Sequence, residues 1–330
     1  MTNLQLKVAT SFEDILQTFK TVYQQWGSED YTIEQFIERE ILSRNETFIK
    51  NNIKSYLLLN ENEKVVSQCE VISRQVYYKD LDGYKELQLN CLASVFTIEN
   101  ERKKGYAEVM INKVLTEMDR KENNLMMLFS DVDNYYERMN FQLQLPFHVQ
   151  FDNTSVTKIQ DKNLKYLNQN QIEQLTTIDC QLSKERIQQL NDEKLLKEGV
   201  FIVEPNFITY KWHWLRSDFY NRHHNIDLPK VYAIEYLNEF MIFDYDFKLN
   251  QLNVIRYNIN QYANPLIQAS LNLANELKLS LIIWNFNISL LNDELRELGI
   301  KVIRKHTLPH VRFNHSNLPI CYELHKYIYC

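Results

Sequence analysis

The chain contains the stretch Leu87-Gln-Leu-Asn-Cys-Leu-Ala-Ser-Val-Phe-Thr-Ile98, then Glu99-Asn-Glu-Arg-Lys-Lys104, then Gly105-Tyr-Ala107. The pattern predicts a strand, a charged turn and a helix that begins after Gly105. Amide groups at a helix start are unpaired and carry the positive end of the helix dipole. Three consecutive cations, Arg102 to Lys104, precede one of only five glycines in 330 residues. This stretch therefore predicts a binding site for a polyphosphate.

The composition is that of a globular protein, with 45% apolar and 24% charged residues. A length of 330 residues allows one large domain or two. The net charge of −6 and the pI near 5.8 argue against broad nucleic-acid binding, which needs a basic surface. We therefore expect no nucleic-acid partner.

The cysteines and histidines show no metal-binding pattern. The five cysteines include no Cys-x-x-Cys pair, and their odd number suggests reduced thiols in a reducing compartment. A surface loop at 223–224 and an aromatic core segment at 212–214 account for the most conspicuous histidines. The N-terminal segment lacks the apolar core of a signal peptide, and no apolar run approaches membrane-spanning length. We expect a cytoplasmic protein with neither a metal nor membrane contact.

The first 150 residues alternate strands and helices, which predicts an α/β fold with a mixed sheet. The expected elements are strand 4–10, helices that begin after Ser11 and Thr32, strands 53–60, 65–78 and 84–98, helix 106–120, strand 125–130 and a short helix at Tyr135 and Tyr136. Ser11-Phe-Glu-Asp14 resembles a capping box, and Thr32-Ile-Glu-Gln35 marks a second helix start. Strand 125–130 is nearly all apolar, which is typical of a buried parallel strand.

The second half repeats this order less clearly. Residues 151–200 look mostly helical, and antiparallel strands are expected at 232–245 and 252–257. Helix 265–277, strand 281–286, helix 292–298 and terminal strands follow, with Asn264-Pro265 in place of a cationic glycine turn. We therefore expect two domains, 1–150 and 151–330, the second being a possible degenerate repeat of the first.

Arg102-Lys-Lys-Gly105-Tyr-Ala107, preceded by Ser94-Val-Phe-Thr97, resembles the acyl-CoA motif of the GNAT acetyltransferase superfamily, Gln/Arg-x-x-Gly-x-Gly/Ala. The resemblance covers about residues 4–145 and implies a GNAT fold that uses acetyl-CoA. It implies that backbone amides from Arg102 to Ala107 hold the CoA pyrophosphate. It also implies that the main chain of β-strand residues 95–97 pairs with the pantetheine. The implied cofactor-binding residues are Val95, Phe96, Thr97, Arg102, Lys103, Lys104, Gly105, Tyr106 and Ala107.

A second match, Tyr136-Glu-Arg-Met-Asn140-Phe141, resembles the Tyr-x-x-x-Gly-Phe pattern of the same superfamily. The resemblance implies that Tyr136 is the general acid that reprotonates the departing CoA thiolate. Asn140 replaces the usual glycine, and asparagine tolerates the left-handed backbone angles that such a turn needs. Among the 20 tyrosines of the chain, packing alone is the competing explanation for Tyr136, and the expected one for Tyr135.

More narrowly, the chain resembles the fungal lysine N6-acetyltransferases, through Ser94–Ile98, Arg102–Ala107 and Leu128-Phe-Ser-Asp131 leading to Tyr135-Tyr136. This resemblance implies direct attack of the side-chain amine of free L-lysine on acetyl-CoA, as a step in lysine breakdown. The second domain would then wall the substrate pocket. Arg216, Arg222 and Arg256 are candidate partners for the substrate carboxylate.

The general base is the least defined group. A lysine-type amine has a pKa near 10.4, so its neutral form at pH 7 costs about 4–5 kcal/mol. Relatives place a Glu on the strand before the CoA turn, where this chain has Asn90, which we assign to substrate binding. Glu70, our choice for the catalytic base, and Glu86 lie on neighbouring expected strands, and Asp131 and Asp133 could hold a cationic substrate. For each acid, a solvated or capping role is the alternative.

Several other functions remain open. A polyamine, a peptide N-terminus or a protein lysine could be the acetyl acceptor, and a non-catalytic CoA-binding module would also fit, since Asn90 cannot accept a proton. A P-loop is excluded because the chain has no Gly-x-x-x-x-Gly-Lys-Ser/Thr, and a dinucleotide-binding Rossmann site lacks its three glycines. The oligomeric state stays undetermined.

Overall fold

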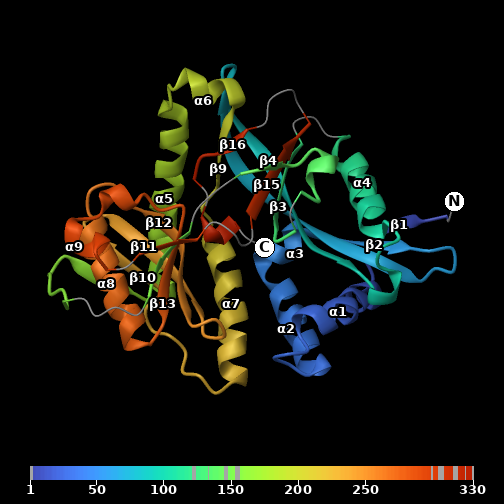
Figure 1. The fold of residues 1–330 in the computed structure, drawn as a ribbon, viewed down its shortest axis with the longest axis horizontal. Coiled ribbons are helices and arrows are strands. Elements are labelled where there is room, and N and C mark those ends of the chain that lie inside the picture. Colours follow the sequence, from blue (N-terminus) through green and yellow to red (C-terminus); the bar gives the residue numbers. More distant parts are fainter. Residues whose placement is uncertain are drawn as a thin grey trace.

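The computed structural model describes residues 3–120, 124–132, 134–144, 148–152, 157–298, 300–303, 308–314, 319–323 and 325–328. Their strands form two mixed sheets, one of nine strands and one of seven, and each sheet is the centre of one lobe (Figure 1). Within this part of the chain, no helix is long and apolar enough to cross a membrane.

The N-terminal half follows the order expected from the sequence, with a further short helix, α3, and a further short strand, β6. Its elements are β1 (Gln5–Val8), α1 (Phe12–Trp26), α2 (Ile33–Asn45), α3 (Thr47–Asn52), β2 (Ile53–Leu59), β3 (Val65–Asp80), β4 (Gly83–Thr97), α4 (Tyr106–Met118), β5 (Leu125–Ser130) and β6 (Gln142–Leu143). The Thr32 side chain and Gln35 complete a capping box at the start of α2, and Ser11 accepts a hydrogen bond from the Asp14 amide at the start of α1.

The C-terminal half contains a second arrangement of the same type. Its elements are β7 (His148–Phe151), β8 (Leu164–Leu167), α5 (Gln169–Gln189), α6 (Glu193–Glu198), β9 (Val200–Val203), α7 (Phe207–His223), β10 (Ala233–Tyr236), β11 (Glu239–Asp246), β12 (Gln251–Asn258), α8 (Ala263–Glu276), β13 (Ser280–Trp284), α9 (Asp293–Arg296), β14 (Lys301–Ile303), β15 (Leu308–Phe313) and β16 (Ile320–Cys321).

The two sheets share one local topology. In the first, β3 and β4 are antiparallel, β4 and β5 are parallel, and α4 connects the parallel pair. In the second, β11 and β12 are antiparallel, β12 and β13 are parallel, and α8 makes the connection. The prediction of a mixed α/β fold is confirmed, and the second sheet repeats the local arrangement of the first.

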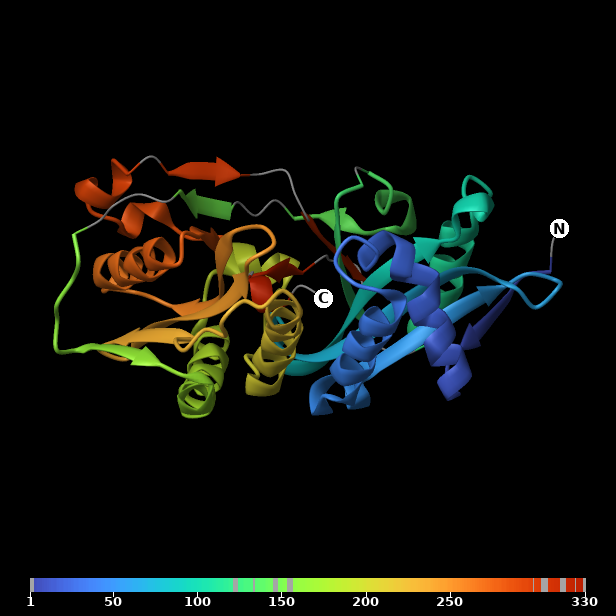
Figure 2. The same cartoon turned by 90° about the horizontal axis from the view of Figure 1, so that it is seen from below.

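Strands of the C-terminal half also complete the first sheet, which the sequence did not predict. Strand β15 pairs with β5 along its whole length, and Figure 2 shows the chain crossing back to the first lobe there. Strand β3 is longer than its partner β2, and β9 pairs with its free stretch from Val76 to Lys79. This pairing satisfies backbone groups that would otherwise be left without partners. The boundary at residue 150 therefore remains a proposal.

One sequence expectation needs correction. His223 ends the 17-residue helix α7 and does not lie in a surface loop. The aromatic core segment at 212–214 is confirmed, because Trp212 and Trp214 of the same helix are buried. The buried residues of α7 lie on several faces, because α2, α3, α5 and β11 all contact it. A helix packed on several sides lacks the one-sided apolar stripe by which helices are recognised in sequence.

Candidate active site

The central strands of the first sheet separate where the site begins. Strands β4 and β5 pair from Leu89 and Leu125 to Leu92 and Leu128, yet β4 continues to Thr97. The register of β3 against β4 shifts between Gln68 and Glu70, which places an additional residue in β4. Ser94 lies at this bulge with a φ of 51°. A cavity of about 380 Å³ is lined by β3, β4 and β5, by α1 and α2, by Asp131, Val132 and Tyr136, and by Arg216 of α7.

The turn before α4 has the geometry that an anion site requires. Gly105 is the N-cap of α4 with a φ of 78°, and no side chain caps the helix. Lys103 also adopts a positive φ, of 65°. A Cβ atom added to Gly105 would contact nothing within 4 Å, so glycine is needed there for its backbone angle and not for space. The first amides of α4 are therefore left for a ligand.

Helix α8 of the second sheet corresponds to α4, and a carboxylate of the protein itself lies at its start. Both carboxylate oxygens of Glu239 accept hydrogen bonds at the start of α8, from the Gln261 amide at 2.7 Å and the Tyr262 amide at 2.9 Å. Glu239 is buried, so this carboxylate occupies the position that a phosphate would need. Of these two helix starts, that of α4 is therefore the one open to an external polyphosphate.

The cations of the turn, Arg102, Lys103 and Lys104, are exposed. The Arg102 side chain lies over the Phe96 ring, and its Nε donates to the Thr97 carbonyl at 3.2 Å. Lys104 forms an exposed ion pair with Glu101 at 2.7 Å, which contributes little to stability. The positive charge of the turn is therefore only partly offset by its own residues.

The main chain of β4 beyond the bulge has two different edges. The Phe96 carbonyl accepts from the Ser67 hydroxyl at 2.8 Å, and the Ile98 amide donates to Val66 on β3. Because main-chain groups alternate between the edges of a strand, those of Val95 and Thr97 point away from β3. Val95 and Thr97 thus have the orientation needed to pair with a pantetheine chain, whereas Phe96 contributes its ring.

Tyr136 lies beyond the end of β5 and lines the cavity, with only 8% of its surface exposed. Its ring contacts those of Tyr135, Phe141 and His310, the last on β15. Burial raises the pKa of Tyr136 to about 12. Among the residues that the structure describes, none forms a hydrogen bond with its hydroxyl. A protonated phenol therefore faces the cavity.

The turn after Tyr136 explains the departure from the superfamily pattern. Asn140 adopts a left-handed conformation with a φ of 63°, and the Phe141 amide closes the turn on the Tyr136 carbonyl at 3.3 Å. Asparagine is among the few residues that adopt this conformation at small cost. The substitution of glycine by Asn140 thus preserves the turn.

Glu70 lines the same cavity from β3 and is held by three partners. It forms an ion pair with Arg44 of α2, and its two oxygens accept from Ser55 at 3.2 Å and Ser94 at 2.7 Å. Ser94 is the residue at the bulge of β4. The structure therefore brings Glu70, Ser94 and Tyr136 to one cavity.

The other predicted acidic and amide residues lie in different surroundings. Asp131 lines the cavity, but Asn90 does not. Asn90 is buried between neighbouring strands, where its amide accepts from Ser73 at 2.9 Å and donates to Asn124 at 3.1 Å. Glu86 forms an exposed ion pair with Lys184 at 2.8 Å, far along β4 from the bulge. Asp133 lies outside the described residues.

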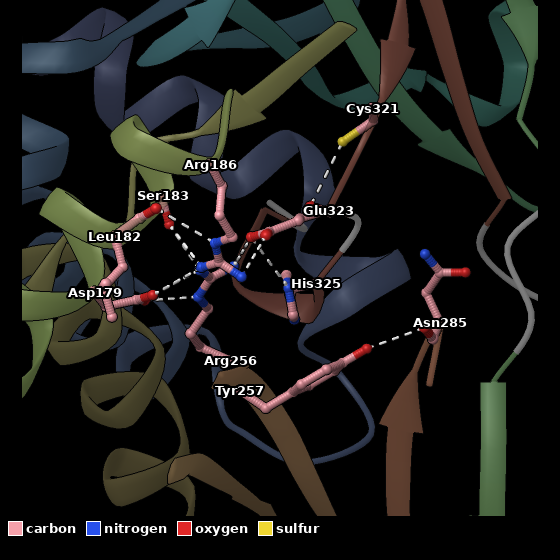
Figure 3. A network of polar contacts seen from close by, with 10 residues as sticks. All are labelled: Asp179, Leu182, Ser183, Arg186, Arg256, Tyr257, Asn285, Cys321, Glu323 and His325. Atoms are coloured by element: carbon pink, nitrogen blue, oxygen red, sulfur yellow. Dashed lines mark hydrogen bonds and ion pairs between the residues drawn. The ribbon is translucent and has the colours of Figure 1, made fainter. Parts of the chain in front are cut away.

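The three candidate arginines lie in different surroundings. Arg216 of α7 lines the cavity. Arg222 is exposed, and its Nε donates to the Asp218 carbonyl one turn back in the same helix. Arg256 is fully buried in a polar network with Asp179, Ser183 and Glu323 (Figure 3). Both nitrogens of its bidentate contact with Asp179 lie 2.7 Å from the carboxylate, so Arg256 has no capacity for a substrate.

The sequence analysis did not identify two residues near the site, Arg39 in the cavity wall and His310 beside the Tyr136 ring. Arg39 of α2 lines the cavity and lies over the Phe36 ring at 4.6 Å, with Glu40 as its ion-pair partner. His310 reaches Tyr136 only because β15 pairs with β5. Neither residue belongs to a recognisable motif, and no local signal would have found them. No cluster of three or more metal-ligand side chains was found in the described part of the chain.

Comparison with known proteins assigns this arrangement to a family. Residues 6–144 match the family described as acetyltransferase (GNAT) domain, and residues 148–322 match the LYC1 GNAT-like C-terminal domain. The chain belongs to the GNAT acetyltransferases. This GNAT protein is 22% identical to a lysine acetyltransferase from Yarrowia lipolytica, over 77% of this chain and 75% of the relative. It is 28% identical to an uncharacterized protein from Saccharomyces cerevisiae, over 57% of this chain and 58% of the relative.

Solved structures share the fold of both lobes. A GCN5-related N-acetyltransferase from Kribbella flavida matches 94% of this chain with 71% of its own, at a TM-score of 0.59 and 10% identity. Eis1 from Mycobacterium abscessus also matches 94% of this chain, with 73% of its own, at a TM-score of 0.54 and 10% identity. These likenesses show the fold of both lobes, and the two family matches make the chain an acyltransferase of GNAT type.

Proposed function

We propose that this GNAT acetyltransferase transfers the acetyl group of acetyl-CoA to the side-chain amine of free L-lysine. The observation that carries the acetyl-CoA part is the uncapped start of α4 at Gly105, with exposed cations beside it and a cavity between the separating strands. The lysine part is supported by the name of the Yarrowia relative. A cytoplasmic location, in keeping with the free Cys69, Cys180 and Cys321, belongs to the same proposal.

The amides from Arg102 to Ala107 would bind the pyrophosphate of CoA, and Lys103 would add charge. The main chain of Val95 and Thr97 would direct the pantetheine along β4 toward the bulge. In the transfer step the amine nitrogen forms a bond to the thioester carbonyl carbon, and the carbon–sulfur bond breaks. The thiolate that leaves takes a proton, and the attacking nitrogen loses one.

Tyr136 would supply the proton to the sulfur. Since burial raises the pKa of Tyr136 to about 12, its phenol is protonated throughout the neutral range. A thiol has a pKa near 8.5, so full transfer from this phenol is uphill by roughly 5 kcal/mol when each group is considered separately. We therefore assign Tyr136 first to a hydrogen bond that stabilises charge developing on sulfur, with proton transfer completed as the thiolate leaves.

Glu70 would receive the proton of the amine through Ser94. Ser94 donates to Glu70 at 2.7 Å and lines the cavity, so its hydroxyl oxygen can accept a proton from the substrate or from a water while it passes its own to the carboxylate. Asp131 would hold the substrate ammonium before it loses its proton. In this scheme Asn90 would maintain the strand spacing and would not contact substrate, because both ends of its amide are engaged.

The test is thiol release from acetyl-CoA with L-lysine, spermidine and a lysine-containing peptide in parallel assays. We expect turnover with lysine to exceed that with the other two. We also expect Tyr136→Phe to lower kcat by about 10²–10⁴-fold with little change in CoA affinity. A matched control is Tyr135→Phe, in which the neighbouring ring is retained.

If thiol release is faster with spermidine or with the peptide than with lysine, lysine is not the preferred substrate. Tight CoA binding without turnover of any amine would identify a CoA-binding module. An unchanged rate in Tyr136→Phe would show that another group serves the sulfur.

A further inference from the structure

Arg216 lies at the junction of two cavities. The first is the cavity that contains Tyr136 and Glu70, and the second, of about 260 Å³, lies between the two lobes. Arg216 comes from α7 and Arg39 from α2, and these two arginines line both cavities. A ligand that extends from Tyr136 toward the second lobe must therefore pass the two guanidinium groups.

The other cations of the second cavity are offset by carboxylates. Lys248 forms ion pairs with Glu29 at 3.0 Å and Asp30 at 2.8 Å. Lys326 lies in the field of Asp244 and Asp246. Arg39, likewise, has Glu40 as its partner.

Arg216 differs from them. It is half-buried with its guanidinium 5.3 Å from the centre of the Trp212 ring, and no residue within the described ranges forms an ion pair or hydrogen bond with it. A partly desolvated cation without a counter-charge is unfavourable and favours an anionic ligand. The planar guanidinium matches the geometry of a carboxylate, which it can bind through two parallel hydrogen bonds.

The first cavity thus has opposite charges at different walls. Glu70 and Asp131 are contributed by β3 and the end of β5, and Arg216 by α7. A molecule with a cationic amine and a carboxylate would match this distribution, whereas a polyamine would place a second ammonium near Arg216.

We propose that the acetyl acceptor is a primary amine that carries a carboxylate, and that Arg216 binds this carboxylate at the junction of the two cavities. This inference rests on the proposed function for the identity of the reacting amine. Arg39 lies beside it with its charge offset by Glu40, and the second cavity receives the amino-acid end of the ligand. Arg216 is in this role a specificity-determining residue and has no part in the transfer step.

The experiment measures calorimetric binding of L-lysine, 6-aminohexanoate and cadaverine to the full chain in the presence of CoA. Lysine and 6-aminohexanoate carry the carboxylate, and cadaverine lacks it. We expect the first two to bind more tightly than cadaverine. We expect Arg216→Met to weaken both by roughly 10- to 150-fold, the range for loss of charge-assisted hydrogen bonds, while cadaverine binding is not weakened.

Arg216→Lys keeps the positive charge but lacks the planar guanidinium with its two parallel hydrogen bonds. Its affinity for lysine should lie between those of Arg216→Met and the wild type. Arg222→Met is the matched control, because it removes an exposed arginine from the same helix and should change nothing. In turnover, Arg216→Met should raise KM for lysine with kcat nearly unchanged, a division that a purely structural role would not produce.

The inference is overturned if lysine does not bind to the wild-type chain, if cadaverine binds equally well, or if Arg216→Met weakens all three ligands alike. Lysine binding that depends on Arg216, without any acetyl transfer, would instead refute the proposed function and support the carboxylate site.

Discussion

Replacement of Gly105 by alanine tests the CoA turn most directly. The φ of 78° at Gly105 costs an L-residue about 1–2 kcal/mol, and the added Cβ would meet no atom within 4 Å. The whole effect of Gly105→Ala is therefore backbone strain. Without ligand, the turn of the variant has two alternatives. It keeps its conformation, in which case the strain lowers the free energy of unfolding, or it relaxes to an unstrained conformation, in which case the free energy of unfolding is unchanged.

If the turn relaxes, CoA binding must restore the strained conformation, and the affinity falls by the same amount. We therefore expect the loss in unfolding free energy and the loss in CoA binding free energy to add up to about 1–2 kcal/mol. A loss taken entirely in binding would correspond to a CoA affinity reduced roughly 5- to 30-fold. Denaturant unfolding and CoA titration calorimetry on the same preparations give the two terms.

Gly83→Ala is the matched control. Gly83 also has a positive φ, of 121°, and open space around its added Cβ, but it lies in the hairpin between β3 and β4. Its strain should appear only as lost stability. Equal losses of CoA affinity in both variants, or an unchanged Gly105→Ala protein, would refute the assignment of the turn.

Further expectations concern pH, the buried ion pair and the carboxylate at the start of α8. Because burial raises the pKa of Tyr136 to about 12, above its usual value of 10, the phenol stays protonated between about pH 8 and 10. A kcat for lysine that falls over that interval in wild type but not in Tyr136→Phe would contradict this. Arg256→Met leaves the buried Asp179 carboxylate with its main partner removed and should lower the unfolding free energy by about 3–5 kcal/mol in denaturant titrations, against less than about 0.5 for Arg222→Met. Glu239→Gln, which removes the charge at the start of α8, should destabilise the second lobe by about 1 kcal/mol without creating a second CoA site in calorimetry.

Local patterns in the sequence were sufficient for the elements around the CoA turn. The start of α4 at Gly105, the capping box of α2 at Thr32 and the left-handed Asn140 each depend on neighbours within a few residues. Such preferences are decided by backbone angles and nearby hydrogen bonds, so they can be read without the fold. The order of strands and helices in the first half followed from periodicity for the same reason.

Local sequence patterns could not predict the contacts between segments that are distant in the sequence. The sequence offered Arg216, Arg222 and Arg256 as equals, and packing alone made Arg256 part of a buried network while it left Arg216 facing two cavities. Likewise, His310 comes to Tyr136 only through the pairing of β15 with β5. The sequence by itself thus determined the turn at Gly105 and the order of elements around it, because these depend on short-range properties of the chain. Which charges meet in the cavity was decided by the tertiary structure, since the burial of a side chain depends on residues far away in the sequence.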